Sequence, residues 1–493
     1  MTVPRRGFLL GVAAATSACT GRSPAGPPAT SAPPSSTAVS RPPDWAALRA
    51  RLPGGLVLPG EPGYDSARRS FNPLFDGQAP AAVATCTRPE DVQACVEEAR
   101  AARIPIAARS GGHGYAGYST PPSGLVVDLA GLSGVRVHAD GTAEIGAGTR
   151  LIDVYAELAR AGRCLPAGSC PTVGIAGLTL GGGIGVLARK FGLTCDRLRS
   201  ARVVTADATL RTAAADSEPD LFWALRGGGG GNLGIVTSFT FTTEPAPDLT
   251  VFALRFPPGA AADVLGAWQR WITDAPDELW SMCAVSAGRP PSVRVGGCFV
   301  GPPSAVAPLL AKLPDPTART VLPKGFLDAM RYFAGCSEHT VARCQLDSAG
   351  GALDRAAFVA SSRVLPGQVD PAHLVSIMDG RTAMDLLLDS FGGAVSRVAP
   401  DATAFPHRGA LASAQIYASA TPASRDRVAR AVAEVRDALG RLTGPAAYVN
   451  YIDSSLPDWA TAYYGANLPR LRQIARHFDP DAVFAFAQGL TNV

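Results

Sequence analysis

Two nucleophilic side chains lie beside glycine-rich segments in the first half of the sequence. His113 directly follows Ser110-Gly111-Gly112, and Cys170 lies within a stretch that runs from Gly168 to Gly185. A third glycine run spans Gly227 to Gly231. Glycine lets backbone N–H groups approach a ligand closely, and successive N–H groups form a concavity that binds anions. The three segments together therefore indicate a phosphate-bearing ligand, of which a dinucleotide pyrophosphate is the obvious example.

Two common phosphate-binding motifs are absent from these segments. The sequence contains no GxxxxGK[ST] P-loop, and the glycines at 181–185 do not belong to a strand–helix unit with an acidic residue about twenty positions on. The residues alone also allow simpler interpretations of these segments, without a bound ligand. The glycine segments could be tight turns, His113 could cap a turn, and Cys170 could be a core thiol or half of a disulfide.

The same segments carry a resemblance to a known family. Arg109-Ser110-Gly111-Gly112-His113 resembles the flavin-attachment loop of the vanillyl-alcohol oxidase superfamily. Gly168-Ser169-Cys170-Pro171-Thr172-Val173-Gly174, followed by the glycines at 181–185, is similar to the second attachment segment of its berberine-bridge-enzyme-like branch. The runs 220–230, 232–237 and Tyr448-Val449-Asn450-Tyr451 match the family in the same order. The resemblance extends from about residue 75 to the end.

The resemblance implies an FAD cofactor held by two covalent bonds. His113 would bond the flavin 8α-methyl carbon through a ring nitrogen, and Cys170 would bond C6 through its sulfur. Such substituents raise the reduction potential of the flavin and prevent loss of the cofactor outside the cell. The family likewise implies that a further set of residues surrounds the cofactor: Arg109, Ser110, Gly111, Gly112, Gly114, Val173, Gly174, Gly177, Gly182, Gly183, Gly185, Ile235, Val236 and Asn450.

The implied activity is that of an oxidase, because the flavin supplies redox chemistry and the protein positions the substrate. We expect hydride transfer from an alcohol or sugar hemiacetal carbon to flavin N5, with O2 as the acceptor. Tyr448 is the first candidate base and Tyr451 the second, and Gln415 would orient the substrate. Some relatives carry a carboxylate on the strand of Gln415, and this chain has none between Asp401 and Asp426, which argues against a carboxylate-based mechanism. A tailoring oxidase of a secondary metabolite and a non-catalytic exported flavin-binding protein are the alternatives.

The elements that must position these residues follow from the hydrophobic pattern. Apolar residues spaced three and four apart predict helices that begin at Pro89 and span 151–161, 423–439 and 468–477. Short apolar or alternating runs predict strands at 81–86, 104–108, 125–129, 235–242, 293–299 and 414–418, a hairpin over 135–145 and a strand-like run at 448–453.

These elements predict an α+β fold with two lobes. The resemblance implies that residues 75–245, with 445–493 returning to them, form a PCMH-type FAD-binding domain. Residues 246–444 would form the substrate domain, an antiparallel sheet with helices on one face, and the active site would lie where the two meet.

The first residues are typical of an export signal. Arg5-Arg6 before a short apolar stretch resembles a twin-arginine signal over residues 1–19, and a Ser/Pro-rich linker follows at 20–43. Cys19 is a candidate for lipid attachment, so we expect a protein that is secreted or anchored outside the membrane. No later segment is long and apolar enough to span a bilayer.

Composition excludes several other classes of function. The net charge is only +4 over 493 residues and no long Lys/Arg run occurs, so nothing favours nucleic acid as a partner. The ten cysteines form no CxxC pair, which leaves a zinc site without support. Cys336–Cys344 and Cys86–Cys95 are candidate disulfides.

Overall fold

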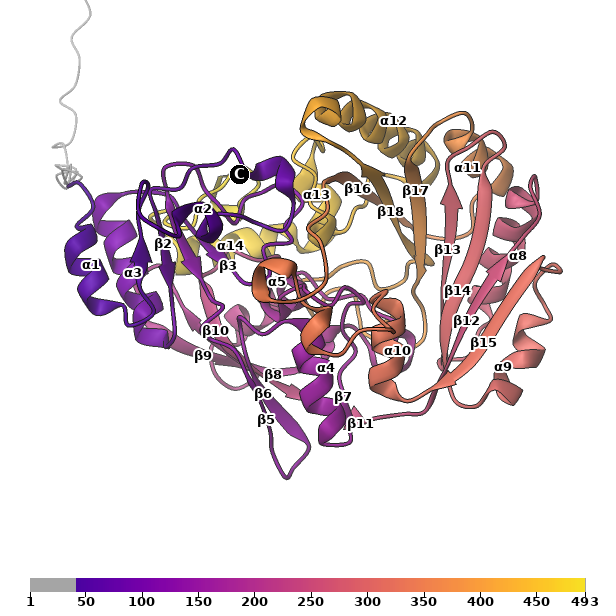
Figure 1. The fold of residues 1–493 in the computed structure, drawn as a ribbon, viewed down its shortest axis with the longest axis horizontal. Coiled ribbons are helices and arrows are strands. Elements are labelled where there is room, and N and C mark those ends of the chain that lie inside the picture. Colours follow the sequence, from indigo (N-terminus) through magenta and orange to yellow (C-terminus); the bar gives the residue numbers. More distant parts are fainter. Residues whose placement is uncertain (1–40, 493) are drawn as a thin grey trace, which may run out of the picture. The chain divides into compact units, whose positions relative to one another are not determined.

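The computed structural model describes residues 41–492. The predicted signal at 1–19, Cys19 and most of the predicted linker lie outside the described residues. Four sheets and their covering helices make up the described chain (Figure 1).

A small, mostly parallel sheet begins the described fold. Its strand order is β1 (Leu56–Val57), β2 (Ala82–Thr85), β4 (Leu125–Asp128) and β3 (Ile106–Arg109). The helix α3 (Pro89–Ala102) links β2 to β3, and Pro89 stands in its first turn, where a missing N–H costs nothing. Because β3 ends at Arg109, the loop that carries His113 leaves the sheet at the carboxyl end of this strand.

A second sheet of five antiparallel strands follows. Its order is β5 (Val135–Val137), β6 (Thr142–Gly146), β10 (Ile235–Thr242), β8 (Leu198–Val204) and β9 (Leu210–Ala214). The predicted hairpin and the predicted strand at 235–242 are confirmed. The remaining elements of this region are α1 (Trp45–Arg51), α2 (Tyr64–Ala67), α4 (Leu151–Arg160), α5 (Ile175–Leu180), α6 (Ala188–Phe191), α7 (Pro219–Ala224) and the two-stranded sheet of β7 (Arg163–Cys164) and β11 (Glu244–Pro245).

The largest sheet has seven strands, and all its neighbouring strands are antiparallel. Their order is β15 (Ala318–Lys324), β12 (Leu249–Arg255), β14 (Ser292–Val300), β13 (Leu279–Ser286), β17 (Met384–Ser390), β18 (Ala412–Ser419) and β16 (Phe358–Leu365). Four helices pack on one face of this sheet and share a core with it: α8 (Ala261–Thr273), α9 (Pro303–Leu310), α11 (Pro371–Met378) and α12 (Arg425–Thr443). The predicted α+β fold, with helices on one face of an antiparallel sheet, is confirmed.

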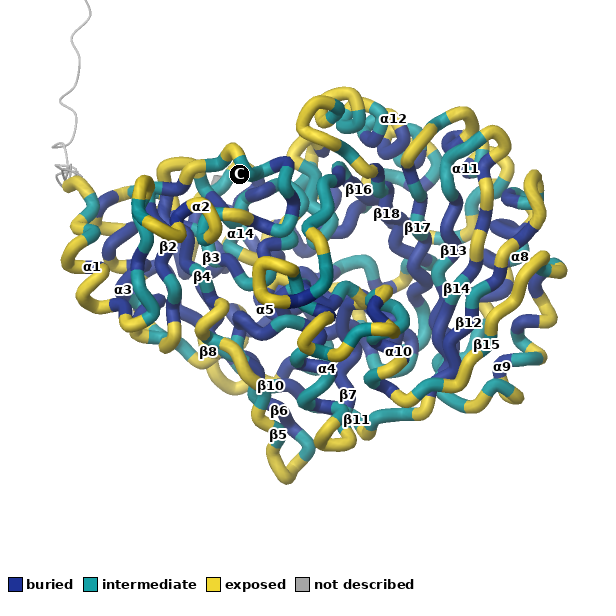
Figure 2. The backbone as a smooth tube through the Cα atoms, in the orientation of Figure 1, coloured by how far each residue is buried: buried dark blue, intermediate teal, exposed yellow. Residues whose placement is uncertain are grey.

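Spacing explains why α12 covers this face. Val432, Val435 and Leu439 recur at three- and four-residue intervals and are buried, whereas Glu434 and Asp437 between them are exposed. Buried and exposed stretches accordingly alternate along α12 (Figure 2). The opposite face of β16, β17 and β18 therefore stays free to line a cavity. The helix α10 (Phe326–Phe333) belongs to the other core, which it shares with α4.

The C-terminal segment returns to the first two sheets. Helices α13 (Trp459–Tyr464) and α14 (Leu468–Phe478) bury Tyr464 and Leu471 in the same core as α7. The predicted strand-like run at 448–453 is wrong, because Val449–Tyr451 form a 3₁₀ helix. The boundaries of the predicted domains stay a prediction.

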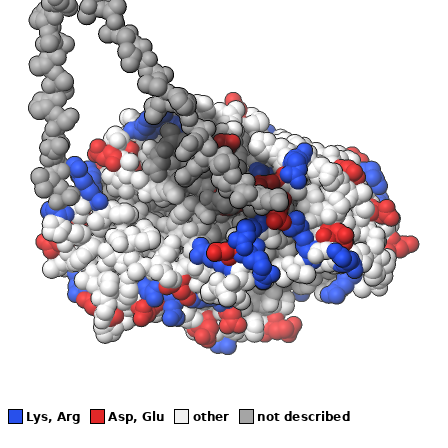
Figure 3. Space-filling model, turned by 90° about the horizontal axis from the view of Figure 1, so that it is seen from above, with Lys and Arg blue, Asp and Glu red and all other residues white. Residues whose placement is uncertain are grey.

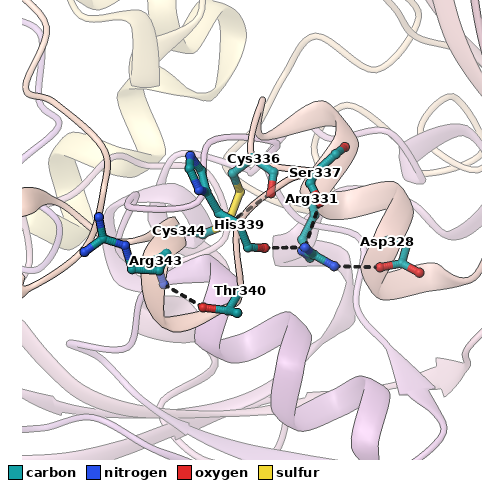
Figure 4. Close-up of a disulfide and its surroundings, with 8 residues drawn as sticks. All are labelled: Asp328, Arg331, Cys336, Ser337, His339, Thr340, Arg343 and Cys344. Carbon is teal, nitrogen blue, oxygen red and sulfur yellow. Dashed lines mark hydrogen bonds and ion pairs between the residues drawn. A yellow bond between two sulfur atoms is a disulfide. The ribbon is translucent and has the colours of Figure 1, made fainter.

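One of the two candidate disulfides forms. Cys336 and Cys344 are bonded, with their Cα atoms 6.0 Å apart, in a loop after α10 (Figure 4). Arg331 braces this loop by donating to the backbone carbonyl oxygens of Ser337 and His339. Cys86 and Cys95 are free thiols whose buried sulfur atoms lie 4.0 Å apart.

Charged side chains of both signs occur on the described surface. Lys and Arg side chains lie among Asp and Glu side chains on the face drawn in Figure 3. Within residues 41–492, no helix is long and apolar enough to cross a membrane.

Candidate active site

A cavity of about 700 Å³ lies between the glycine-rich loops and the free face of β16, β17 and β18. Its volume falls in the range of sites that hold cofactors and substrates. Most of the predicted site residues line it: Ser110, Gly111, Gly112, His113, Gly114, Cys170, Val173, Gly174, Gly177, Ile235, Val236, Gln415, Tyr448, Asn450 and Tyr451. The fold therefore gathers side chains from distant parts of the sequence at one site.

Four predicted cofactor residues do not line the cavity. Arg109 pairs with Asp128 across β3 and β4, at 2.5 Å, and stabilises the sheet instead. Gly182, Gly183 and Gly185 lie where the chain packs tightly. A Cβ on Gly183 would fall 2.3 Å from Thr194 Oγ1, and one on Gly185 would fall 1.8 Å from the carbonyl oxygen of Ala167.

His113 and Cys170 both contact the hydroxyl of Thr172. His113 Nε2 lies 2.9 Å from Thr172 Oγ1, and Cys170 Sγ lies 3.9 Å from the same oxygen. The imidazole also stacks on Phe71, with ring centroids 3.8 Å apart. An imidazole and a thiol from separate loops thus stand side by side on the cavity wall.

Two glycines allow the loops that carry them to meet. A Cβ on Gly111 would fall 2.3 Å from the backbone nitrogen of Gly174, and one on Gly174 would fall 1.9 Å from Ser110 Oγ. The guanidinium of Arg150 holds the first loop by donating to the Ser110 carbonyl oxygen at 2.6 Å. These positions exclude side chains because backbone packs on backbone.

Burial keeps both nucleophiles uncharged. Burial, assisted by the nearby positive charge of Arg150, lowers the pKa of His113 to about 3. The imidazole is therefore neutral at physiological pH, with a lone pair on one nitrogen. Burial raises the pKa of the Cys170 thiol, although its contact with Thr172 acts in the opposite direction.

The hydroxyl of Tyr448 is fixed by hydrogen bonds to neighbouring residues. Its buried hydroxyl oxygen accepts hydrogen bonds from the Gly183 backbone N–H at 3.0 Å and from Asn450 Nδ2 at 2.8 Å. Burial raises the pKa of Tyr448. The residue thus ties the turn at 181–185 to the C-terminal segment.

The 3₁₀ helix at Val449–Tyr451 explains how a second tyrosine reaches the same site. Residues three apart in a 3₁₀ helix lie on one side, whereas in a strand they would face opposite sides. Tyr448 and Tyr451 accordingly make an edge-to-face contact, with ring centroids 5.0 Å apart. Tyr451 also stacks parallel to Tyr115, at 5.5 Å, and the Tyr115 hydroxyl oxygen accepts from Gln415 Nε2 at 2.6 Å.

Sequence reasoning missed a carboxylate beside this cluster. Asp389 on β17 pairs with Ser413 of β18, so it lies one strand away from the residues searched for an acid. Burial raises the pKa of Asp389 to about 7. Burial also raises the pKa of Tyr451, and the charge of Asp389 raises it further, which places the two groups within electrostatic range. Asp389 is recognised as part of the site only from the register of β17 with β18.

Part of the cavity wall is aromatic and polar. Phe358 stacks on Tyr417, with ring centroids 4.9 Å apart, and Asp385 lies opposite Tyr417 in the register of β17 and β18. Sequence reasoning also missed Phe71, Tyr115 and Thr172. Thr172 lies two positions after Cys170, inside the second motif, and Tyr115 lies two positions after His113, just beyond the first.

Comparison with known proteins assigns this arrangement to a family. Residues 80–214 match the model of an FAD binding domain, and residues 447–491 match the model described as berberine and berberine like. The FAD-linked oxidoreductase YgaK of Bacillus subtilis is 32% identical over 90% of this chain and 98% of its own length. The chain belongs to the berberine-bridge-enzyme-like FAD-linked oxidoreductases.

Other members of this family extend the comparison. A xylooligosaccharide oxidase of Thermothelomyces thermophilus is 31% identical over 83% of this chain and 87% of its own length. The solved structure of Physcomitrella patens BBE-like 1 shares 30% identity and superposes with a TM-score of 0.83, covering 90% of this chain and 98% of that one. The chain is thus an FAD-linked oxidoreductase with the fold of this family.

The residues of the cavity fit an FAD. The backbone at Gly111, Gly174 and Gly177 forms part of its wall, and a Cβ at Gly177 would meet open space. The neutral imidazole and the thiol supply nucleophiles at one end. Ile235 and Val236 contribute apolar side chains to the same wall.

Proposed function

We propose that the protein is an exported oxidase whose FAD is bonded to both His113 and Cys170. Its substrate is an alcohol or a sugar hemiacetal, and O2 is the electron acceptor. The observation that carries the proposal is the meeting of His113 and Cys170 at one threonine hydroxyl on the cavity wall. Two nucleophiles that contact one small group can both reach one ring system.

When bound, the FAD accepts a hydride from the substrate carbon. The protein must take the proton of the substrate hydroxyl, and Tyr451 is the group that we assign to this step. Unlike Tyr448, whose oxygen already accepts two hydrogen bonds, Tyr451 has a hydroxyl without a hydrogen-bond partner in residues 41–492. The charge of Asp389 raises the pKa of Tyr451, so the phenol acts as a base only by passing its own proton to the ionised carboxylate of Asp389, which we assign as the final acceptor.

Gln415 and Tyr115 orient the substrate beside Tyr451. The hydrogen bond between them fixes the amide of Gln415, and its carbonyl oxygen stays available to accept from a substrate hydroxyl. The aromatic pair of Phe358 and Tyr417, with Asp385 next to it, suits a polyhydroxylated ring. Similarity to a xylooligosaccharide oxidase supports a sugar substrate.

Export is part of this proposal. Paired arginines at 5 and 6 precede the apolar stretch of a twin-arginine signal, which carries proteins that are already folded. A covalently held cofactor suits such a route, because FAD cannot be replaced outside the cell. Lipid attachment at Cys19 would anchor the enzyme at the outer face of the membrane.

A substrate screen that records both peroxide release and anaerobic loss of flavin absorption tests the activity. We expect reducing oligosaccharides such as xylobiose to give both signals. Turnover of aromatic or polycyclic alcohols alone would point to a tailoring oxidase. Flavin bleaching without peroxide in air would replace O2 by another acceptor. No bleaching with any reductant would indicate a flavin-binding protein and refute the proposed oxidase.

A further inference from the structure

The hydroxyl of Thr172 lies between the two nucleophiles of the cavity wall. Its hydroxyl is within contact distance of both His113 Nε2 and Cys170 Sγ, at 2.9 Å and 3.9 Å. The residue is buried, and its backbone carbonyl oxygen would lie only 3.0 Å from a Cβ on Gly111. Close packing of the two loops therefore fixes the hydroxyl between the imidazole and the thiol.

The imidazole of His113, the hydroxyl of Thr172 and the thiol of Cys170 can form one continuous series of hydrogen bonds. A neutral imidazole has one N–H and one bare nitrogen, and a hydroxyl both donates and accepts. If His113 Nε2–H donates to Thr172 Oγ1, the hydroxyl proton is free to point at Cys170 Sγ. His113 Nδ1 then carries the lone pair, and no group in residues 41–492 donates to it.

We infer that Thr172 is the positioning residue for covalent flavin attachment at both His113 and Cys170. This inference rests on the proposed double attachment and adds the residue that aligns the two nucleophiles. The hydroxyl holds the imidazole in the tautomer whose Nδ1 attacks the flavin methyl carbon. It also donates to the sulfur as the thiol loses its proton.

Each attachment is an oxidation and needs an acceptor. At His113, the imidazole N–H and one C–H of the 8α-methyl group are replaced by a C–N bond. At Cys170, the S–H and the C6–H are replaced by a C–S bond. The two hydrogens lost in each case reduce one O2 to hydrogen peroxide. Thr172 passes protons along but is unchanged at the end.

The test compares Thr172→Val with Thr172→Ser, using the purified full-length protein. Valine keeps the volume of threonine and removes the hydroxyl, whereas serine keeps the hydroxyl. Intact mass after denaturation counts the flavin bonds, and NMR of the flavinyl peptide identifies the attached ring nitrogen. Thr250→Val is the matched control, since Thr250 is a buried threonine on β12 that donates only to the Gly301 carbonyl oxygen.

We expect most Thr172→Val protein to carry flavin through one bond or none. Where His113 is bonded, some molecules should be attached through Nδ1 and others through Nε2. Thr172→Ser and Thr250→Val should retain two bonds and attachment through Nδ1. Complete double attachment through Nδ1 in Thr172→Val would overturn the inference. If the valine variant fails to fold, Thr172→Ala provides the same comparison. Wild-type protein without any covalent flavin would instead refute the proposed attachment itself.

Discussion

Burial sets the protonation state of the reactive side chains in the cavity and of Asp389 beside the tyrosine cluster. His113 is neutral because burial lowers its pKa to about 3, and Asp389 titrates near neutrality because burial raises its pKa to about 7. Burial also raises the pKa of Tyr451. Unassisted, that phenol would be a poor base, so the proposed chemistry depends on Asp389 as the acceptor of the phenolic proton.

The two tyrosines of the 3₁₀ helix should respond differently to loss of the hydroxyl. Tyr451→Phe should lower kcat by about 10²- to 10⁴-fold, the usual contribution of a general base. Tyr448→Phe removes an acceptor of two hydrogen bonds and should cost about 1–3 kcal/mol of unfolding free energy. Stopped-flow reduction and thermal unfolding measure the two effects. Equal loss of kcat in both variants would contradict the assignment of the base.

The carboxylate should make turnover dependent on pH. Asp389 is protonated below its pKa of about 7 and ionised above it, so kcat/KM should rise with pH through about 7. Asp389→Asn should remove this rising limb and lower the maximal rate. A rising limb that persists unchanged in the variant would show that another group titrates.

Stability should follow the opposite trend at this site. A carboxyl whose pKa is raised on folding stabilises the native state below its unfolded pKa, and this stability is lost as the pH rises through about 7. The unfolding free energy of wild type relative to Asp389→Asn should therefore fall between pH 5 and pH 8. Denaturant titrations at the two pH values provide the comparison.

Sequence motifs identified the reactive side chains on loops but not their neighbours across a sheet. His113, Cys170 and the two tyrosines stand in recognisable segments. Asp389 does not, because only the register of β17 with β18 brings it to the site. Phe71 reaches His113 from a loop that precedes the first recognised motif.

Two loops and one short helix determine the geometry at the scale of elements. The loops meet at Gly111 and Gly174, where backbone packs on backbone. The 3₁₀ helix Val449–Tyr451 turns both tyrosines to one side. The alternating pattern of 448–453 suggested a strand, since an isolated 3₁₀ turn has no hydrophobic period of its own to set it apart.

A side chain at the loop contact should uncouple the two attachment points. Gly174→Ala places a methyl group 1.9 Å from Ser110 Oγ, so the loops must separate. We expect loss of at least one flavin bond and destabilisation of about 1–3 kcal/mol, typical of overpacking. Gly77→Ala is the control, because a Cβ there meets nothing within 4 Å. Full covalent loading in Gly174→Ala would show that the contact is dispensable.

The disulfide between Cys336 and Cys344 should stabilise the loop after α10. It closes a short loop after α10, where Gln345 Nε2 also donates to Asp153 on α4 at 2.8 Å. Replacing both Cys336 and Cys344 by serine should cost roughly 2–3 kcal/mol, from the entropy of closing a loop of this length. Thermal unfolding with and without reductant measures it. Reductant should shift wild type and leave the double variant unaffected.

The cavity joins parts of the molecule that are far apart in sequence. Its walls come from the glycine-rich loops, from the free face of the seven-stranded sheet and from the C-terminal segment. The sequence predicted this sheet and the helices that cover one of its faces, because each has a clear hydrophobic period. It could not predict which strands would be neighbours, since β16 pairs with β18 rather than with the next strand along the chain.

Cofactor binding should therefore stabilise the whole chain. His113→Ala/Cys170→Ala should bind FAD reversibly, and added FAD should raise its melting temperature in a concentration-dependent way. Free FAD at a hundred times its Kd should raise the unfolding free energy by about 2.7 kcal/mol. Wild type, whose FAD is covalently bound under the proposed attachment, should not respond. A double variant that melts independently of FAD would show that the cavity does not bind it.

Double attachment of the flavin is most directly tested by denaturing the wild-type protein in acid and weighing it. Double attachment predicts a yellow pellet whose polypeptide mass is increased by one FAD, less two hydrogens for each bond formed. His113→Ala and Cys170→Ala should each keep the flavin through the remaining bond. A colourless pellet of unmodified mass, with the flavin left in the supernatant, would contradict it.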